Sequence, residues 1–176
     1  MKVLWLVSFR PIGKSKSNDF FQSMFVDSVK SLDNDIYFSL TQFNEKNVKK
    51  FIKEKKIKNF YKNISKKKLP PGKKYSNKLM LSNALDQFIE KGKFNYLVFS
   101  TADILVPNNL FHELKKINIK NFCGFVYPNT QVINGELKNT FWPYYGIDLI
   151  VFKIDKKKAR EFRKIIKFYN QYDWGV

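Results

Sequence analysis

Asp103 is a carboxylate at a position that core packing does not explain. It follows the apolar run Phe94–Phe99 after the small residues Ser100–Ala102, so a ligand could approach the backbone closely there. A carboxylate at such a point can bind Mg²⁺ or Mn²⁺, which usually completes its shell with water and substrate phosphates. The alternative is a turn or a helix cap before Ile104–Pro107. The pattern therefore predicts either a metal-and-phosphate site or a local cap.

Two basic residues stand where phosphate could bind. Arg10 is one of three arginines in a chain whose 33 basic residues are otherwise all lysine, and it follows the apolar run Val3–Phe9. A guanidinium held at the end of a buried strand can bind phosphate through two hydrogen bonds. Lys78 opens a predicted helix and could point a cation at the same region. For both residues the alternative is a solvated surface position.

Acceptor chemistry has candidates later in the chain. Asp148 could take the proton of an acceptor hydroxyl if it projects into a cleft. Trp142 and Tyr144 belong to the aromatic segment Phe141–Gly146. Aromatic faces stack on the apolar faces of sugar rings, and Tyr or Trp can also donate hydrogen bonds. The same segment could instead close one end of the core.

Strand and helix signals alternate along the chain, which is the pattern of an α/β sheet. The predicted strands are near-continuous apolar runs, as in mostly parallel sheets that helices cover on both faces. Helices are predicted from apolar residues at three- and four-residue spacing, the first capped by Asn18 or Asp19. The predicted strands are Val3–Phe9, Asp35–Leu40, Ile57–Ile64, Phe94–Phe99, Asn121–Tyr127 and Asp148–Ile154; helices follow Asn18 and Asn44 and cover Asn77–Lys91, Asn108–Ile117 and Ala159–Tyr169; Gln131–Leu137 is a predicted turn.

A chain of 176 residues predicts a single domain, residues 1–176, with a Lys- and Pro-rich loop at about 65–76. Ligands of open α/β sheets bind beyond the carboxyl ends of the strands. That rule places three segments at the predicted site, namely Ser8–Pro11, Thr41-Gln42 and Ser100–Asp103.

The segment Lys78–Pro107 resembles the central part of GT-A-type glycosyltransferases, especially those like family 2. There a helix precedes a strand that ends in an Asp-x-Asp-like motif, and here the helix precedes Asn-Tyr-Leu-Val-Phe-Ser-Thr-Ala-Asp-Ile-Leu-Val-Pro. Thr101 stands where the family's first Asp is expected, so one carboxylate of the motif remains. The later Gly146–Lys153 resembles the strand before the acceptor-side helix. The resemblance covers most of the chain in order.

The resemblance implies a fold, a donor and a set of roles. The implied fold is a mostly parallel central sheet of GT-A type flanked by helices, and the implied donor is a nucleotide-diphospho-sugar held with Mg²⁺ or Mn²⁺. Asp173 is the best match to the family's general base, with Asp148 as the other candidate. The implied donor-binding residues are Ser8 and Arg10 at the base and ribose, Gln42 and Thr101 in the nucleotide pocket, Lys78 at the diphosphate and Asp103 at the metal; Trp142 and Tyr144 lie on the acceptor side.

The charge of the chain indicates the sign of its partners. The formal net charge is +18 at pH 7 and the pI is about 9.8. Such a surface attracts nucleotide phosphates, anionic lipid headgroups and nucleic acid. Proteins that grip nucleic acid usually use arginine heavily, and this chain does not. The lysine-rich loop could close over phosphates or touch an anionic membrane.

The sequence lacks the residues that several classes of protein function require. One Cys and one His exclude an internal disulfide framework and a Cys-based zinc site, and they fit a reduced, cytoplasmic protein. No P-loop and no Gly-x-Gly-x-x-Gly fingerprint is present. Gly13 is the only glycine of the first loop, which disfavours a sugar nucleotidyltransferase with its glycine-rich loop. No apolar run approaches the length of about 18 residues that a membrane span needs.

The expected function is transfer of a sugar from a nucleotide-diphospho-sugar to a hydroxyl of a saccharide or lipid-linked acceptor. The expected setting is bacterial surface-polysaccharide assembly in the cytoplasm, with peripheral contact at the inner face of the membrane. Two alternatives stay open. One is a basic nucleic-acid-binding protein, whose binding would fall steeply with salt and need no divalent ion. The other is a glycosyltransferase-like domain that binds without catalysing.

Overall fold

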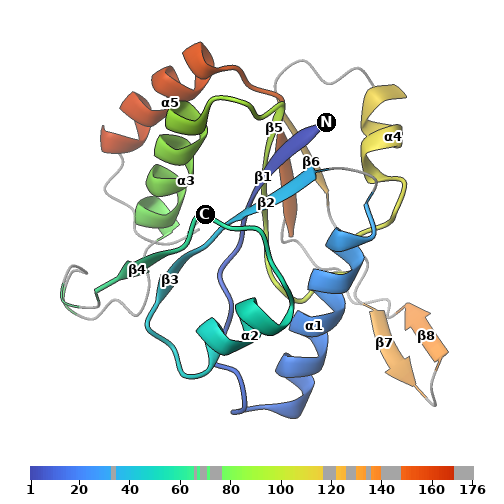
Figure 1. Ribbon diagram of the computed structural model, residues 1–176. Helices are drawn as coiled ribbons and strands as arrows, with labels where there is room; N and C mark the ends of the chain where they lie inside the picture. Colours follow the sequence, from blue (N-terminus) through green and yellow to red (C-terminus); the bar gives the residue numbers. More distant parts are fainter. Residues whose placement is uncertain are drawn as a thin grey trace.

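The core of the molecule is a five-stranded sheet in the order β2-β1-β5-β9-β6 (Figure 1). The computed structural model describes residues 1–32, 35–65, 67, 71, 77–116, 122–125, 130–133, 136–139 and 148–168. β1 pairs in parallel with β2 and β5, whereas β9 runs antiparallel to β5 and β6. All strands of this sheet except β9 therefore share one direction. The strands are β1 (Lys2–Leu6), β2 (Asp35–Ser39), β5 (Tyr96–Ser100), β6 (Phe122–Phe125) and β9 (Leu149–Phe152).

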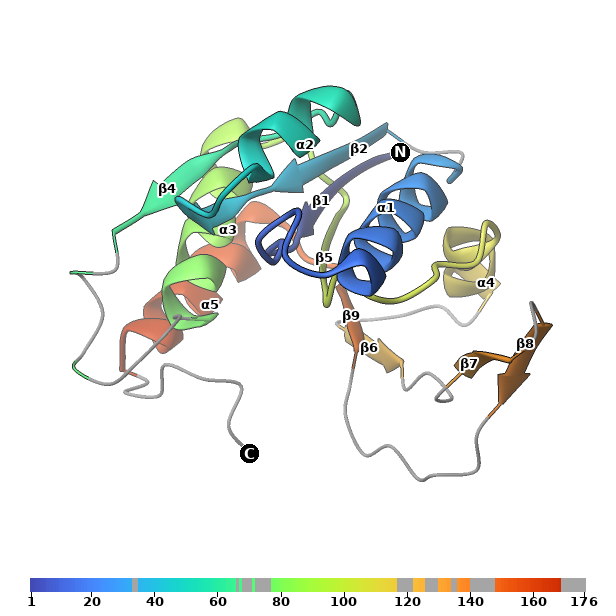
Figure 2. The ribbon, with the colours of Figure 1, turned by 90° about the horizontal axis from the view of Figure 1, so that it is seen from below.

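Helices cover both faces of the sheet (Figure 2). Alternate residues of β1 point to opposite faces, because a strand has a period of two. Val3 and Trp5 join the apolar cluster under α1, α2 and α4, and Leu4 and Leu6 join the cluster under α3 and α5. The predicted α/β class, with a mostly parallel sheet flanked by helices, is confirmed. The helices are α1 (Lys16–Lys30), α2 (Val48–Glu54), α3 (Asn77–Lys91), α4 (Leu110–Lys116) and α5 (Lys156–Phe168).

Two small sheets lie outside the central one. β3 (Thr41–Phe43) pairs in parallel with β4 (Lys62–Ile64). The segment directly after the predicted strand Asp35–Leu40 is therefore a second strand and not a loop. β7 (Thr130–Ile133) and β8 (Glu136–Asn139) pair antiparallel over the segment predicted as a turn. The prediction of a turn at residues 131–137 was therefore wrong in extent, because most of that segment is strand.

The first helix begins earlier than its sequence pattern suggests. Ser15 is its N-cap, and the Ser15 hydroxyl accepts a hydrogen bond from the backbone N–H of Asn18 at 3.4 Å. The predicted caps Asn18 and Asp19 lie inside the helix. Asp19 instead accepts the backbone N–H of Gly13 at 2.9 Å, and Gly13 has a φ of +85°, which glycine adopts without strain. Within the described residues no helix is long and apolar enough to cross a membrane.

Candidate functional site

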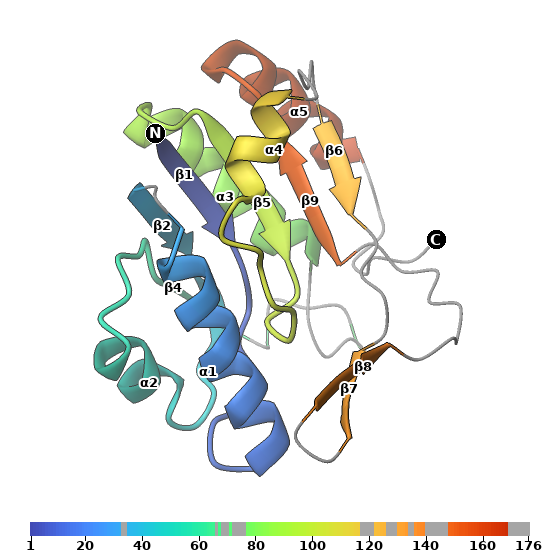
Figure 3. The same cartoon turned by 90° about the vertical axis from the view of Figure 1, so that its right-hand side faces the viewer.

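Arg10 and Asp103 meet at the carboxyl edge of the sheet. The strands that precede them, β1 and β5, are parallel neighbours and end at the same edge (Figure 3). Nη2 of Arg10 lies 3.6 Å from Oδ2 of Asp103, and these side chains are 63% and 44% exposed. An exposed ion pair contributes little to folding stability. Both groups are therefore open to a ligand at this edge.

The loop that carries Arg10 is held by a buried glutamine. Gln42, in β3, is 1% exposed. Its side-chain oxygen accepts the backbone N–H of Phe9 at 2.9 Å, and its side-chain nitrogen donates to the Phe9 carbonyl at 2.7 Å. The Ser8 hydroxyl also lies 3.4 Å from the same oxygen. Gln42 thus fixes the backbone on the N-terminal side of Arg10.

Further contacts hold the rest of the same loop. The backbone N–H of Arg10 donates to the side-chain oxygen of Gln22, in α1, at 2.6 Å. The N–H of Ile12 donates to the Lys46 carbonyl at 3.2 Å. Together with the contacts of Phe9 and Gly13, these bonds occupy the backbone donors at positions 9, 10, 12 and 13, and Pro11 has none. The loop therefore presents the side chain of Arg10 and not a row of open amides.

The exit of β5 is held from both sides. Nε1 of the fully buried Trp5 donates to the Ser100 hydroxyl at 2.8 Å. The backbone N–H of Thr101 donates to the Asp148 carbonyl at 3.2 Å. Asp148 reaches this edge because β9 is antiparallel, so that the amino end of β9 lies beside the carboxyl end of β5, with Leu149 opposite Ser100. The direction of β9 thus joins two predicted site segments that are far apart in sequence.

Lys78 lies at the start of α3, on the same side of the molecule. α3 packs against β1, β2 and β3 and ends at Lys91, shortly before β5 begins. α3 runs in the opposite direction to β5, so the first turn of α3 lies toward the carboxyl end of β5 (Figure 1). Lys78 is half-buried in the first turn of α3, and its approach to a diphosphate stays a prediction.

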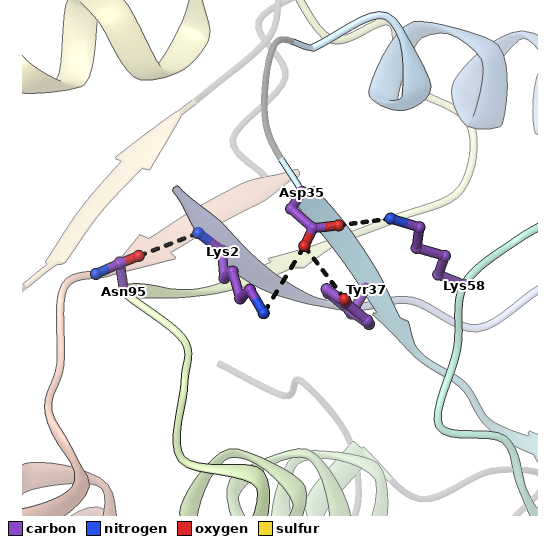
Figure 4. A network of polar contacts seen from close by, with 5 residues as sticks. All are labelled: Lys2, Asp35, Tyr37, Lys58 and Asn95. Atoms are coloured by element: carbon purple, nitrogen blue, oxygen red, sulfur yellow. Dashed lines mark hydrogen bonds and ion pairs between the residues drawn. The ribbon is translucent and has the colours of Figure 1, made fainter.

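The lowered carboxyl pKa of Asp35 belongs to the opposite edge. A hydrogen bond from Nζ of Lys58 at 2.7 Å holds the pKa of Asp35 below its ordinary value of 3.8, with help from Tyr37 and Lys2 (Figure 4). The same contact raises the pKa of Lys58 above its ordinary 10.5. Because Asp35 starts β2, this network ties down the amino ends of β1 and β2 and takes no part in the site at their other ends.

A surface cleft of about 380 Å³ lies between β4 and α3, away from Arg10 and Asp103. Asp86 and Glu90 contribute carboxylates to its lining. Asp86 is bound by Arg163, whose Nε lies 2.7 Å from it. Among the described residues, Lys62 is the one basic residue that lines the cleft, and it stands beside two carboxylates, so we do not assign a nucleotide diphosphate to this cleft. Burial raises the pKa of Tyr61, which lines the cleft, above 10.0 and keeps the phenol neutral.

One carboxylate is in place to bind a metal at the Arg10–Asp103 edge. Within the described parts of the chain, no three His, Cys, Asp or Glu side chains gather as metal ligands. Mg²⁺ commonly uses one or two carboxylates and completes its shell with water and substrate phosphates. The donor set at Asp103 therefore fits an ion that enters together with a diphosphate, and it does not fit a preformed metal centre.

The structure brings together part of the predicted site. Arg10, Thr101 and Asp103 share one edge, Asp148 borders it through its backbone, and Lys78 lies on the same side. Gln42 was predicted to line the nucleotide pocket, but its side chain is buried and its polar atoms bind Phe9, so its observed place is behind the loop. The predicted residues Asp173, Trp142 and Tyr144 lie outside the described residues, as does most of the loop at 65–76.

Sequence reasoning missed Gln22. Its side chain is 2% exposed and lies on the apolar face of α1, three, four and seven residues before Phe25, Val26 and Val29. A polar residue in the middle of a helix's buried stripe needs a hydrogen-bond partner inside the protein. That mismatch between the type of residue and its position is the signal that could have identified it.

No family model and no curated protein matches the chain by sequence. Among solved structures, the chain is similar to a 4-diphosphocytidyl-2C-methyl-D-erythritol synthase from Anaerococcus prevotii, with a TM-score of 0.55 and 11% identity over 98% of this chain and 80% of that one. A second synthase of the same name gives a TM-score of 0.51 and 10% identity, over 97% of this chain and 80% of that one. These likenesses show a shared α/β fold, and they do not confirm the glycosyltransferase family.

Proposed function

We propose that this chain binds a nucleotide-diphospho-sugar at the Arg10–Asp103 edge and transfers its sugar to a hydroxyl. The observation that carries the proposal is the ion pair itself, a cation and a carboxylate from two neighbouring loops at the ligand-binding edge of the sheet. The proposed acceptor is a saccharide or a lipid-linked saccharide, as in bacterial surface-polysaccharide assembly. A basic protein with a net charge of +18 favours such an anionic donor.

Recognition of the diphosphate would rest on side chains. Arg10 would replace its contact with Asp103 by hydrogen bonds to phosphate oxygens, since guanidinium binds phosphate in a two-point geometry. Lys78 would add a second positive charge from the start of α3. The rigid backbone around Arg10 would limit the ordering that binding requires, which favours affinity.

Asp103 would then bind Mg²⁺ or Mn²⁺ together with the diphosphate. The bound ion would supply charge neutralisation for the leaving nucleoside diphosphate. The bond between the anomeric carbon and the phosphate oxygen breaks, and a bond from the acceptor oxygen to that carbon forms. Asp148, beside Thr101, would accept the hydroxyl proton if the configuration inverts. Asp173 is the other candidate for this proton acceptor.

A second candidate function is nucleotidyl transfer, in which a nucleoside triphosphate loses pyrophosphate. The fold favours it, because the similar solved structures are synthases whose named product carries a diphosphocytidyl group. The hydrogen bonds of the loop between β1 and α1 disfavour nucleotidyl transfer. Loops that hold a triphosphate offer several backbone N–H groups to the phosphates, and the donors at positions 9, 10, 12 and 13 are already bound within the protein.

Product analysis separates the two functions. The protein is incubated with UDP-sugars or with CTP, each with Mn²⁺ and with sugar or sugar-phosphate acceptors. Release of UDP, with hydrolysis counted as slow transfer to water, supports glycosyl transfer. Release of pyrophosphate from CTP supports nucleotidyl transfer and contradicts our proposal. Release of neither product, combined with tight salt-sensitive binding of oligonucleotides without a divalent ion, would favour the nucleic-acid alternative.

A further inference from the structure

Two phenylalanines on α1 are in contact with each other at the protein surface. The side chains of Phe20 and Phe21 are 56% and 41% exposed. Their ring centroids lie 5.8 Å apart in an edge-to-face arrangement. Most large apolar side chains of the described residues are buried in the two core clusters, so this pair is an exception in a protein with ample core. Adjacent exposed aromatic rings often mark a binding surface.

Cations flank this aromatic pair. Lys16 lies four residues before Phe20, on the same side of the helix, and the exposed Lys14 precedes the helix. The acidic residue of the first turn is turned inward, because one oxygen of Asp19 accepts the N–H of Gly13 and the other is buried. The first two turns of α1 thus combine exposed aromatic rings with exposed positive charge.

We infer that Lys14, Lys16, Phe20 and Phe21 form a docking surface for an anionic lipid bilayer. Phe rings enter the boundary between headgroups and acyl chains, while lysines bind the anionic headgroups. The net charge favours an anionic bilayer over a second copy of the chain as the partner, because two molecules that each carry +18 repel one another. Docking by this surface does not depend on the proposed transferase activity.

The position of the docking surface relates it to the Arg10–Asp103 edge. Nη1 of Arg10 lies 3.4 Å from the side-chain oxygen of Asn18, which sits one turn before Phe21. Long helical side chains lean toward the helix N-terminus, so we expect the ring of Phe21 to lie toward Asn18. A bilayer that contacts the aromatic pair would therefore lie next to Arg10. If the proposed transfer is correct, this arrangement suits an acceptor whose lipid end stays in the membrane.

Vesicle flotation tests the docking surface. The full chain is mixed with phosphatidylcholine vesicles and with vesicles of equal parts phosphatidylcholine and phosphatidylglycerol. Four variants are compared with the wild type. Phe20→Ser/Phe21→Ser removes the rings, and Lys14→Gln/Lys16→Gln removes the local charges. The matched controls are Ile165→Ser, which removes an apolar side chain that is 54% exposed on α5, and Lys53→Gln/Lys157→Gln, which removes the same net charge from exposed sites elsewhere.

We expect the wild type to bind the anionic vesicles and not the zwitterionic ones. Phe20→Ser/Phe21→Ser should weaken binding at least tenfold, and Lys14→Gln/Lys16→Gln should weaken it about tenfold. The two controls should stay within about twofold of the wild type. Thermal unfolding of each variant confirms that it folds, which substitution of exposed side chains allows.

Three results would overturn the inference. The first is no binding of the wild type to anionic vesicles, or equal binding to both vesicle types. The second is a loss of binding that the control variants share, which would assign the effect to the overall charge. The third is a dimer in sedimentation velocity that Phe20→Ser/Phe21→Ser dissociates, which would assign the aromatic pair to contact between copies of the chain.

Discussion

The guanidinium of Arg10 lies 3.6 Å from the carboxylate of Asp103, across the carboxyl edge of two neighbouring parallel strands. The exposed pair Lys50 and Glu54 on α2 has the same separation of 3.6 Å but lies within one helix. The two pairs match in charge and distance, all four side chains are exposed, and the pairs differ in place. Lys50 and Glu54 are therefore suitable controls for every substitution of Arg10 and Asp103.

Removal of the Arg10–Asp103 pair should leave the fold intact. We expect Arg10→Gln and Asp103→Asn to change the free energy of unfolding by less than about 1 kcal/mol, because exposed ion pairs contribute little. Lys50→Gln and Glu54→Gln should behave alike in urea unfolding. A much larger loss for Asp103→Asn would show that this carboxylate has a structural role, as in a turn or a cap.

Substitution of Gln42 should be costly. Gln42→Leu leaves the N–H and the carbonyl of buried Phe9 without partners, which should lower the free energy of unfolding by about 2–4 kcal/mol. Gln22→Leu is the comparison, because it removes one bond to Arg10 but also removes a buried NH₂ group without a partner among the described residues. We expect a loss for Gln22→Leu of less than half that for Gln42→Leu. Equal losses in urea unfolding would contradict the assigned role of Gln42.

Substitution of Ser100 tests the support of the β5 exit. Ser100→Ala leaves the indole N–H of buried Trp5 unpaired and should destabilise the protein by about 1–3 kcal/mol. Ser100→Thr keeps a hydroxyl and should restore most of the stability. Urea unfolding followed by tryptophan fluorescence measures both. An unchanged midpoint for Ser100→Ala would show that the hydrogen bond does not contribute.

The network at Asp35 predicts a pH dependence. Because the pKa of folded Asp35 is lowered, its contribution to stability is present above pH 3.8 and is lost as the pH falls through 3.8 and then through the lower folded value. Asp35→Asn should therefore flatten the acid limb of stability against pH. In Lys58→Met protein, the carboxyl pKa of Asp35 measured by NMR should rise. An unchanged pKa would exclude Lys58 as the main cause.

The sequence was sufficient for the fold class, and it predicted that Arg10 and Asp103 lie at one edge of the sheet. Apolar runs and helical spacing predicted the central strands and placed α3 at Asn77–Lys91 as observed. Prediction of Arg10 and Asp103 at one edge followed from the rule for the carboxyl ends of parallel strands, and it did not depend on knowing any side-chain contact. That the two side chains meet was not predicted.

The remaining differences depend on pairing between distant segments. Thr41–Phe43 forms a strand because Lys62–Ile64 pairs with it, and no local pattern records that partner. The antiparallel direction of β9, which brings Asp148 beside Thr101, is likewise a property of the sheet. The hydrogen-bond partners of Gln22 and Gln42 are set by the path of the loop between β1 and α1, which the residue pattern does not specify.

Calorimetric titration with UDP, with and without Mn²⁺, tests the proposed nucleotide site at Arg10 and Asp103. We expect that the wild type binds UDP, that Mn²⁺ tightens the binding, and that Asp103→Asn abolishes the effect of Mn²⁺. Arg10→Gln should weaken binding with or without the ion, and Lys50→Gln and Glu54→Gln should bind like the wild type. Mn²⁺-dependent binding of UDP by Asp103→Asn at the wild-type affinity, or no binding of UDP by the wild type, would contradict the proposed site.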